Sequence, residues 1–342
     1  MANRPKRATV KDVAELAGVS WKTVTNVMHG RYNVRESTRQ KVLDAAAQVG
    51  YRASLAGRQL RSGRTDILAL AVPEMSVFYF AHLAHRFIEE GDRRGLTVFI
   101  YETFQSAERE RVAAQGFDVA FADGVILSPV TMRTDELVGL DAVVPLVVLG
   151  ESVEGVTADH IAIDNVTSAS DLTRHLVEQG RAQIYFIGGT PGRHEGTDGL
   201  RQRGWREELI RHGLTPPDEW VWPADFSLDG GYATVKDLLD QGHRPDALVC
   251  GNDDVALGAL HALRQFGLKV PDAVMVAGWD DAPAGRFASP TLTTVKPDVD
   301  ALVTAALDSV MARINGDVSD PKEIVVAHKL EVRDSTTMGS VA

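Results

Sequence analysis

The sequence predicts an all-α helix-turn-helix head followed by an α/β core of two doubly wound parallel-sheet lobes. Residues 8–30 read as two short helices joined at Gly18. From Asp66 onward, apolar strand-like runs alternate with amphipathic helical segments, which is typical of parallel sheets. The 342 residues are enough for a small module and a large core. We therefore expect a head at 1–50, a linker at 51–65 and a two-lobed domain at 66–342.

The first expected helix begins after Thr9. Thr9 and Asp12 match the capping pattern in which each side chain bonds the other residue's backbone amide. Val13, Leu16 and Ala17 recur at helical spacing and are expected to form one apolar face. Gly18 then ends the helix, because glycine tolerates the positive φ angle of a tight turn.

The second expected helix is capped by Ser20 and directs Val24 and Val27 back at the first. Its outward face combines polar and aromatic side chains, namely Trp21, Lys22, Thr25 and Asn26. Such a face on the second of two short helices is typical of a helix that reads DNA. An ordinary helical hairpin with a solvated face is the alternative, and it is the commoner meaning of this pattern alone.

The charge distribution favours DNA binding. Residues 1–65 contain 13 Lys+Arg and 4 Asp+Glu, a net charge of +9, although the whole chain carries -11. The other 277 residues contain 23 and 43, a net charge of -20. A basic head on an acidic body confines contact with phosphate to the head.

Two further segments complete the amino-terminal part. A third helix is expected at residues 36–49 after a basic loop at 31–35, with four residues facing inward: Val42, Leu43, Ala46 and Val49. In residues 51–64, Gly57 interrupts the few apolar side chains, so this segment alone is a marginal helix or a flexible linker. On DNA, two such segments from a dimer are expected to order over the minor groove, with a leucine wedged between base pairs.

The strands and helices of the core follow from apolar runs and helical periodicity. A first set of strands is expected at 67–72, 97–101, 124–127 and 145–149, and a second set at 160–163, 183–187, 220–221, 247–250 and 274–277. Later strands are expected at 293–294, 323–326 and 328–332. The two sets are expected to form the two lobes. Helices are expected near 80–94, 107–117, 134–140, 166–179, 197–211, 228–241, 253–266 and 298–314. Ligand is expected in the cleft beside the strand ends.

The number of cysteines and the length of the apolar runs indicate the cellular compartment. Cys250 is the single cysteine, so no intrachain disulfide forms, and its apolar neighbours indicate a buried small side chain. Residues 1–7 are basic but no apolar segment follows them, which predicts no signal peptide. No apolar run reaches the length of roughly 18 residues that a spanning helix needs. We expect a cytoplasmic protein without a membrane partner.

Several motifs together resemble the lactose/galactose repressor (LacI/GalR) family of bacterial transcription regulators. They are TVKDVAELAGVSWKTVTNVMHG, STRQKVLDAAAQVGY and GRQLRSGR in the head and linker, and IAIDN, IYFIGG, RQRGW, CGNDDVALGAL, VPDAVMVAGWDD and SPTLTTVKPD in the core. The resemblance implies a homodimer on a palindromic operator, a hinge helix, and a core like periplasmic sugar-binding proteins that senses a small molecule. It also implies that Leu60 is the wedging leucine.

The chain departs from the family pattern at positions that bear on DNA. The family usually has Ser-Arg where Thr25-Asn26 stand, and Asn-Gly where His29-Gly30 stand. Because arginine suits guanine and asparagine suits adenine, we expect an altered operator. The hinge usually carries Pro-Asn at residues 53–54 and alanine at Gly57, and glycine there costs a helix about 1 kcal/mol.

The expected DNA contacts fall into two groups. Base-edge candidates are Trp21, Lys22 and Asn26, with Thr25 secondary, and His29, Arg31, Gly57 and Leu60 complete the expected DNA-binding set. Phosphate anchors are Arg31, Arg35, Arg39 and Arg58, for which simple solvated charge is the alternative. Trp21 is also consistent with a packing role. Two or three base contacts at about 1–3 kcal/mol each favour a dimer, since specific binding needs roughly 4–10 kcal/mol over non-specific binding.

For the small molecule, the resemblance places contacts at Arg201, Asn252 and Asp280. Arginine and aspartate each hold two hydroxyls, and the amide both donates and accepts, which suits a sugar. Further candidates are Phe226 and Trp279 for ring stacking, Phe78 and Phe80 on the other lobe, and Glu151 beside Gly150, which replaces a frequent aspartate. Structural roles are the alternative: Asp280 or Asn252 as loop caps, and Phe80 or Trp205 as core residues.

Other functions are less consistent with the sequence. Gly188-Gly189 lacks the spacing of a dinucleotide loop, and no nucleophile elbow or metal-ligand cluster is present, so no enzyme, cofactor or metal is expected. His194 and Glu195 lie in a glycine-rich loop expected to cover the ligand. A transport-type sugar-binding protein is opposed by the basic head. A purine corepressor or a phosphoprotein partner stays open, and the tail after Asp334 has no leucine heptad for tetramers.

Overall fold

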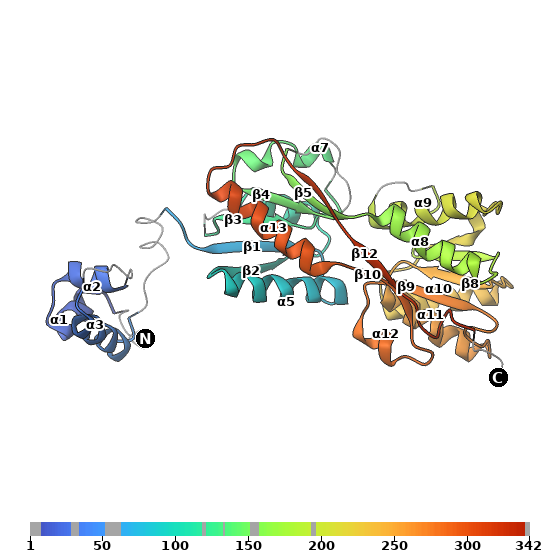
Figure 1. Cartoon of the computed structure of the whole chain (residues 1–342), viewed down its shortest axis with the longest axis horizontal. Coiled ribbons are helices and arrows are strands. Elements are labelled where there is room, and N and C mark those ends of the chain that lie inside the picture. Colours follow the sequence, from blue (N-terminus) through green and yellow to red (C-terminus); the bar gives the residue numbers. More distant parts are fainter. Residues whose placement is uncertain are drawn as a thin grey trace, which may run out of the picture. The chain divides into compact units, whose positions relative to one another are not determined.

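The computed structural model describes residues 8–28, 34–51, 63–117, 121–132, 134–150, 157–192 and 196–338. The chain forms two compact units, Met1–Thr65 and Asp66–Ala342 (Figure 1). In the described part of the chain, no helix is long and apolar enough to cross a membrane.

The first unit contains α1 (Val10–Ala17), α2 (Trp21–Met28) and α3 (Glu36–Gln48). The capping box at its start is confirmed, because Asp12 accepts from the Thr9 amide at 2.6 Å and Thr9 accepts from the Asp12 amide at 3.4 Å. Gly18 ends α1 with φ 67°, as expected for a glycine in a left-handed turn. This turn sets the angle at which α2 leaves α1.

The core of the first unit differs from the expected apolar faces at two positions. Leu16 is 47% exposed and Leu43 is 42% exposed, so the prediction that they face inward is wrong. Ala14 and Ala45 are buried in their place. Each helix is therefore turned about its own axis by about one residue from the orientation that would bury its leucine. Small side chains at the contacts let the three helices approach closely.

The second unit contains two six-stranded sheets, one in each lobe (Figure 1). The first has the order β11-β5-β4-β3-β1-β2, with β1 (Ile67–Val72), β2 (Thr97–Glu102), β3 (Gly124–Leu127), β4 (Leu146–Leu149), β5 (Asp159–Ile163) and β11 (Glu323–Val326). The second has the order β12-β10-β9-β8-β6-β7, with β6 (Ile184–Ile187), β7 (Val221–Trp222), β8 (Ala247–Cys250), β9 (Met275–Trp279), β10 (Thr293–Pro297) and β12 (His328–Glu331). All pairs are parallel except β10 with β12.

Helices cover these sheets. In the first lobe they are α5 (Phe78–Arg93), α6 (Ala107–Ala114), α7 (Thr134–Leu137) and the 3-10 turn η1 (Leu140–Ala142). In the second they are α8 (Asn165–Glu178), α9 (Gly196–Arg211), η2 (Asp218–Trp220), α10 (Leu228–Asp240), α11 (Asp253–Gln265) and α12 (Pro283–Phe287). The sequence did not predict α12 or η2, and the expected helix at 134–140 is broken at Gly139, whose φ is 80°.

The chain passes between the lobes more than once. The expected grouping placed 160–163 with the second lobe, but β5 pairs with β4 and belongs to the first sheet. The chain also returns late, since α13 (Val299–Ile314) packs against β3, β4 and β5, and β11 pairs with β5 (Figure 1). Residues near 164, 298 and 327 therefore connect the lobes, and the strand ends of both sheets meet around one cleft.

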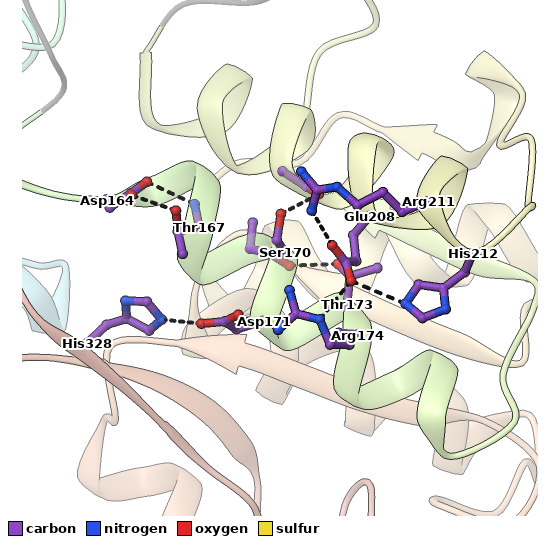
Figure 2. A network of polar contacts seen from close by, with 12 residues as sticks. Asp164, Thr167, Ser170, Asp171, Thr173, Arg174, Glu208, Arg211, His212 and His328 are labelled. Carbon is purple, nitrogen blue, oxygen red and sulfur yellow. Dashed lines mark hydrogen bonds and ion pairs between the residues drawn. The ribbon is translucent and has the colours of Figure 1, made fainter.

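A polar network fixes α9 against α8 in the second lobe (Figure 2). Glu208 is 1% exposed and accepts from Arg174 Nε at 2.8 Å and from Arg211 Nη1 at 2.5 Å. Burial raises the pKa of Glu208, but its bonds to Arg174 and Arg211 outweigh that effect and lower it overall. Asp171 on α8 in turn bonds His328 of β12 at 2.9 Å. These bonds position α9, whose first turns face the cleft.

Candidate nucleic-acid interface and ligand pocket

The outer face of α2 carries the expected DNA-reading side chains. Trp21 is 62% exposed and Lys22 is exposed, whereas Val24 and Val27 are buried against α1 and α3. The alternative packing role for Trp21 is therefore wrong within this unit. Thr25 and Asn26 are half-buried on the same helix. The helix presents these polar groups because its two valines anchor the opposite face.

Of the expected phosphate anchors, the structure describes two. Arg35 is exposed immediately before α3. Arg39 lies one turn into α3, with its Nε 3.6 Å from Glu36 Oε2. In this pair Glu36 is exposed and Arg39 is half-buried. His29, Arg31, Gly57, Arg58 and Leu60 lie outside the described residues.

A pocket of about 690 Å³ of empty space, open to solvent, lies at the carboxyl ends of the strands in both lobes. From the first lobe it is lined by Val77, Tyr79, Phe80, Ser128, Pro129, Val130, Leu149, Gly150, Ile163 and Leu302. From the second lobe it is lined by Asn165, Thr197, Arg201, Phe226, Asn252 and Asp280. Five of the expected effector residues thus come together: Phe80, Arg201, Phe226, Asn252 and Asp280.

Arg201 on α9 is held in place from three directions. Its Nε donates to Asn165 Oδ1 at 2.9 Å and its Nη1 donates to the Gly251 carbonyl at 2.5 Å. Its guanidinium lies 4.0 Å from the centre of the Trp279 ring. A cation over an indole face is a favourable contact in an enclosed site. The guanidinium is therefore held in one orientation at the wall of the pocket.

Trp279 does not stack on a ligand, contrary to expectation. Its side chain is 0% exposed because β9 buries it in the core of the second lobe beneath Arg201. Phe78 also fails to line the pocket, since it begins α5 and stacks on His82 with ring centres 5.5 Å apart. Trp205 is a core residue, as its structural alternative suggested. Glu151, His194 and Glu195 lie outside the described residues.

Asn252 serves the fold and the pocket together. Its Oδ1 accepts from the Val255 amide at 2.9 Å and caps α11, and its Nδ2 lies 3.4 Å from the Phe226 carbonyl. The same residue lines the pocket. The capping role that was weighed as an alternative is therefore real, and it orients the amide toward the site.

Asp280 is the carboxylate of the pocket. It follows β9 with φ 102°, a strained conformation that aims a residue out of the strand end. Burial raises the pKa of Asp280 to about 6, nearby Arg201 opposes that shift, and Asp254 adds to it. Asp253 stands behind it, 1% exposed, with Oδ2 accepting from the Ala282 amide at 2.6 Å. Burial and Asp280 raise the pKa of Asp253 well above its ordinary value.

Comparison with known proteins identifies the family. Residues 9–54 match the family described as bacterial regulatory proteins, lacI family, and residues 173–336 match the periplasmic binding protein-like domain. The HTH-type transcriptional repressor PurR of Glaesserella parasuis serovar 5 (strain SH0165) is 30% identical over 325 residues, or 95% of each chain. The chain belongs to the LacI family. It is thus a DNA-binding transcription regulator with the LacI-like fold predicted from the sequence.

Two solved structures of transcription regulators are similar along nearly the whole chain. The lac repressor dimer bound to operator and the anti-inducer ONPF is 25% identical, covers 97% of this chain and 100% of its own, and has a TM-score of 0.86. The complex of the transcriptional regulator CelR with cellobiose is 28% identical, covers 96% and 100%, and has a TM-score of 0.70. The predicted helix-turn-helix and two parallel-sheet lobes are therefore confirmed.

The sequence missed several residues of this LacI-family pocket. Asn165, Thr197 and Leu302 line it but were not expected there. Asn165 had a readable signal, because it lies two residues after the end of the apolar strand in the motif IAIDN. Leu302 had none, since it reaches the first lobe from a helix more than 130 residues further along the chain than β5. Cys250 is buried as expected, and burial raises the pKa of its thiol.

Proposed function

We propose that this chain is a repressor that holds a palindromic operator as a homodimer and releases it when a sugar binds the pocket. Residues 1–50 bind DNA, 51–65 form the hinge, and 66–342 bind the effector and the second subunit. The protein acts in the cytoplasm and performs no catalysis. The observation that carries the proposal is the convergence of Arg201, Asn252 and Asp280 on one pocket in a chain that begins with a helix-turn-helix.

The chemistry of the pocket supports a sugar. A carboxylate and a guanidinium each bind two adjacent hydroxyls, and an amide serves as donor and acceptor. Phe226 offers an aromatic face to the ring of the ligand. The guanidinium and the amide are oriented before ligand arrives, since Arg201 and Asn252 are bonded to the backbone. A preorganised site loses less entropy on binding.

The operator contacts belong to α2. Trp21, Lys22 and Asn26 contact base edges, with Thr25 secondary, and Arg35 and Arg39 contact phosphate. His29, Arg31, Gly57 and Leu60 contribute as the family pattern implies. Two subunits are needed, since two or three base contacts at about 1–3 kcal/mol each only begin to supply the roughly 4–10 kcal/mol of specific binding.

Ligand controls operator affinity through the hinge. Closing the two lobes on a ligand changes how the first lobes of a dimer meet, which separates or disorders the paired hinges at residues 54–60. Effector and operator then oppose each other reciprocally by about 1–3 kcal/mol. Hydrogen exchange of the hinge tests this step: protection should appear with operator and fall when ligand is added. Equal protection in all states would contradict it.

A purine effector is the second candidate. Tyr79, Phe80 and Phe226 line the pocket, and their flat rings suit a purine as well as a sugar. The name of the similar protein PurR of G. parasuis also favours a purine. In this case the ligand would strengthen operator binding.

One experiment tests the proposed function. Duplex DNA is selected from a random pool with the full-length protein, and the selected operator complex is then challenged with a carbohydrate panel and with hypoxanthine and guanine. We expect a palindromic sequence and its release by a sugar. Purine-strengthened binding would replace the sugar with the second candidate, and no preference over scrambled duplex would refute the proposal.

A further inference from the structure

We propose that effector binding to the pocket is coupled to the loss of a proton from Asp280, and that Asp254 helps to set the pH at which this coupling acts. The inference rests on the proposed sugar effector and assigns a regulation to the same site. On binding, the O–H bond of the Asp280 carboxyl group breaks and its proton passes to solvent. Acidic pH then opposes the effector and keeps the operator occupied.

The carboxyl group of Asp280 is available to a ligand. Asp280 lines the pocket, and its amide donates to the Val295 carbonyl at 2.8 Å, which holds the backbone in place. Within the described residues, its carboxyl group makes no hydrogen bond and no ion pair. An ionised carboxylate accepts through both oxygens, whereas a protonated carboxyl group must donate through one of them. Two neighbouring sugar hydroxyls that donate to Asp280 therefore select its ionised form.

Little positive charge reaches this carboxyl group. Arg201 is the one cation among the described lining residues. Its Nε donates to Asn165 Oδ1 at 2.9 Å, its Nη1 donates to the Gly251 carbonyl, and its guanidinium lies over the Trp279 ring. The guanidinium is thus directed at neutral partners. A carboxyl group removed from water without a paired cation holds its proton to higher pH.

A second carboxyl group stands behind Asp280 and is neutral. Asp253 is 1% exposed, and its Oδ2 accepts from the Ala282 amide at 2.6 Å. Its Oδ1 has no hydrogen-bond partner in the part of the chain that the structure describes. Burial and the nearby Asp280 raise the pKa of Asp253 well above its ordinary value. A buried carboxyl group with no cation beside it keeps its proton, so Asp253 carries no charge at neutral pH.

Asp254 is the carboxylate whose charge acts on Asp280. It is half-buried in the first turn of α11, forms no ion pair with the described residues and does not line the pocket. Burial raises the pKa of Asp280 to about 6, Arg201 opposes this shift, and the charge of Asp254 adds to it. Replacing Asp254 therefore changes the ionisation of Asp280 without removing a contact to the ligand.

The other charged groups beside Asp280 are balanced. Asp281 follows Asp280 in the chain, and its carboxylate accepts from Arg286 and Arg333 and lies 3.5 Å from Lys296 Nζ. These three cations outnumber the one carboxylate that they surround. Unlike Asp254, this cluster adds no net negative charge at Asp280.

Isothermal titration of the full-length protein at pH 5 and pH 7 tests the coupling. The probes are glucose, galactose, mannose and xylose with their methyl glycosides, and circular dichroism verifies the fold at each pH. For the sugar that binds, a pKa of about 6 predicts that the affinity falls by about tenfold from pH 7 to pH 5. At pH 6, titrations in phosphate and Bis-Tris, whose ionisation enthalpies differ, should report about half a proton released per pocket.

Three isosteric variants assign the charges. Asp254→Asn should lower the midpoint of the pH dependence by about half a pH unit, which reduces the fall in affinity to about fourfold. Asp229→Asn is the matched control, because Asp229 lies in the first turn of the neighbouring helix α10 and is exposed. It should retain the full fall. Asp253→Asn should retain it too, since Asp253 has no charge to remove.

The outcomes separate this inference from the proposed function. A sugar that binds equally well at pH 5 and pH 7, with the same heat in both buffers, overturns the inference alone. A fall that Asp254→Asn leaves unchanged, or that Asp229→Asn or Asp253→Asn reduces by as much, overturns the role of Asp254. Binding of no sugar in the panel overturns the sugar effector itself and this inference with it.

Discussion

Replacing Asp280 by asparagine tests the electrostatics of the pocket without knowledge of the effector. Burial raises the pKa of this carboxyl to about 6 from an ordinary 3.8. Between those two pH values, the folded chain binds more protons at Asp280 than the unfolded chain does. The free energy of unfolding therefore falls as the pH rises through this interval, and the loss is complete above pH 6.

The magnitude follows from the size of the shift. One pKa unit corresponds to about 1.4 kcal/mol, so a shift of roughly two units costs at most about 3 kcal/mol at neutral pH. Asp280 is only half-buried as a residue, because one side faces the open pocket, and water there reduces the cost. We expect about 1–2 kcal/mol between pH 4.5 and pH 7.5. The asparagine variant has no charge to desolvate and escapes this loss.

Urea unfolding of the wild type and Asp280→Asn at pH 4.5 and pH 7.5 measures the effect. The attraction to Arg201 is already contained in the pKa of about 6, because it opposes the effect of burial. The informative quantity is therefore the change with pH in the difference between the variant and the wild type. The free energy of unfolding of the variant, relative to that of the wild type, should increase as the pH rises. Asp272→Asn, at an exposed residue, controls for general pH dependence. If the free energy of unfolding of the variant minus that of the wild type stays constant or falls with rising pH, the reasoning is refuted.

Three further substitutions test other parts of the structure. Thr9→Ala removes one half of the capping box of α1 and should destabilise the first unit by about 1 kcal/mol, seen as earlier loss of helical circular dichroism on heating; an unchanged melting curve would contradict the role of the cap. Gly251→Ala places a Cβ 2.7 Å from Phe226 Cζ, so it should displace that ring. We expect a loss of about 1–3 kcal/mol in urea unfolding and weaker binding of the sugar found in the panel. Unchanged stability and unchanged sugar affinity would show that the ring moves without cost. Leu60→Ala should lower operator affinity while the salt-dependent affinity for random DNA persists; an equal fall in both would exclude a wedging role.

The local features of the fold were readable from the sequence. Thr9 with Asp12, and Gly18 with its positive φ, are signals carried by neighbouring residues, and the structure confirms them. The apolar runs of β1 and β8 were placed at the observed boundaries because each is buried on both faces. Leu16 and Leu43 were predicted to be buried but are exposed. The helical spacing of apolar residues does not determine which small residues of a helix face its neighbours.

The features that the sequence did not predict depend on contacts between distant segments. The place of β5 in the first sheet is decided by its pairing with β4 and with β11, about 160 residues later. Trp279 was expected at the ligand, but the arrival of Arg201 from α9 covers its ring. In the sequence, Asp253 has the position of an acidic residue in the first turn of a helix. Its burial depends on the distant turn at Ala282, whose amide donates to its carboxylate.

The central claim is that α2 reads the operator, and a change of base preference tests it most directly. Duplex selection is performed with the wild type and with Asn26→Arg, and Lys41→Arg, at an exposed site on α3, serves as the control. Since asparagine pairs with adenine and arginine with guanine, we predict that adenine is replaced by guanine at one symmetric pair of operator positions, with the rest of the sequence retained. An unchanged selected sequence from Asn26→Arg, or no selected sequence from the wild type, would contradict the account.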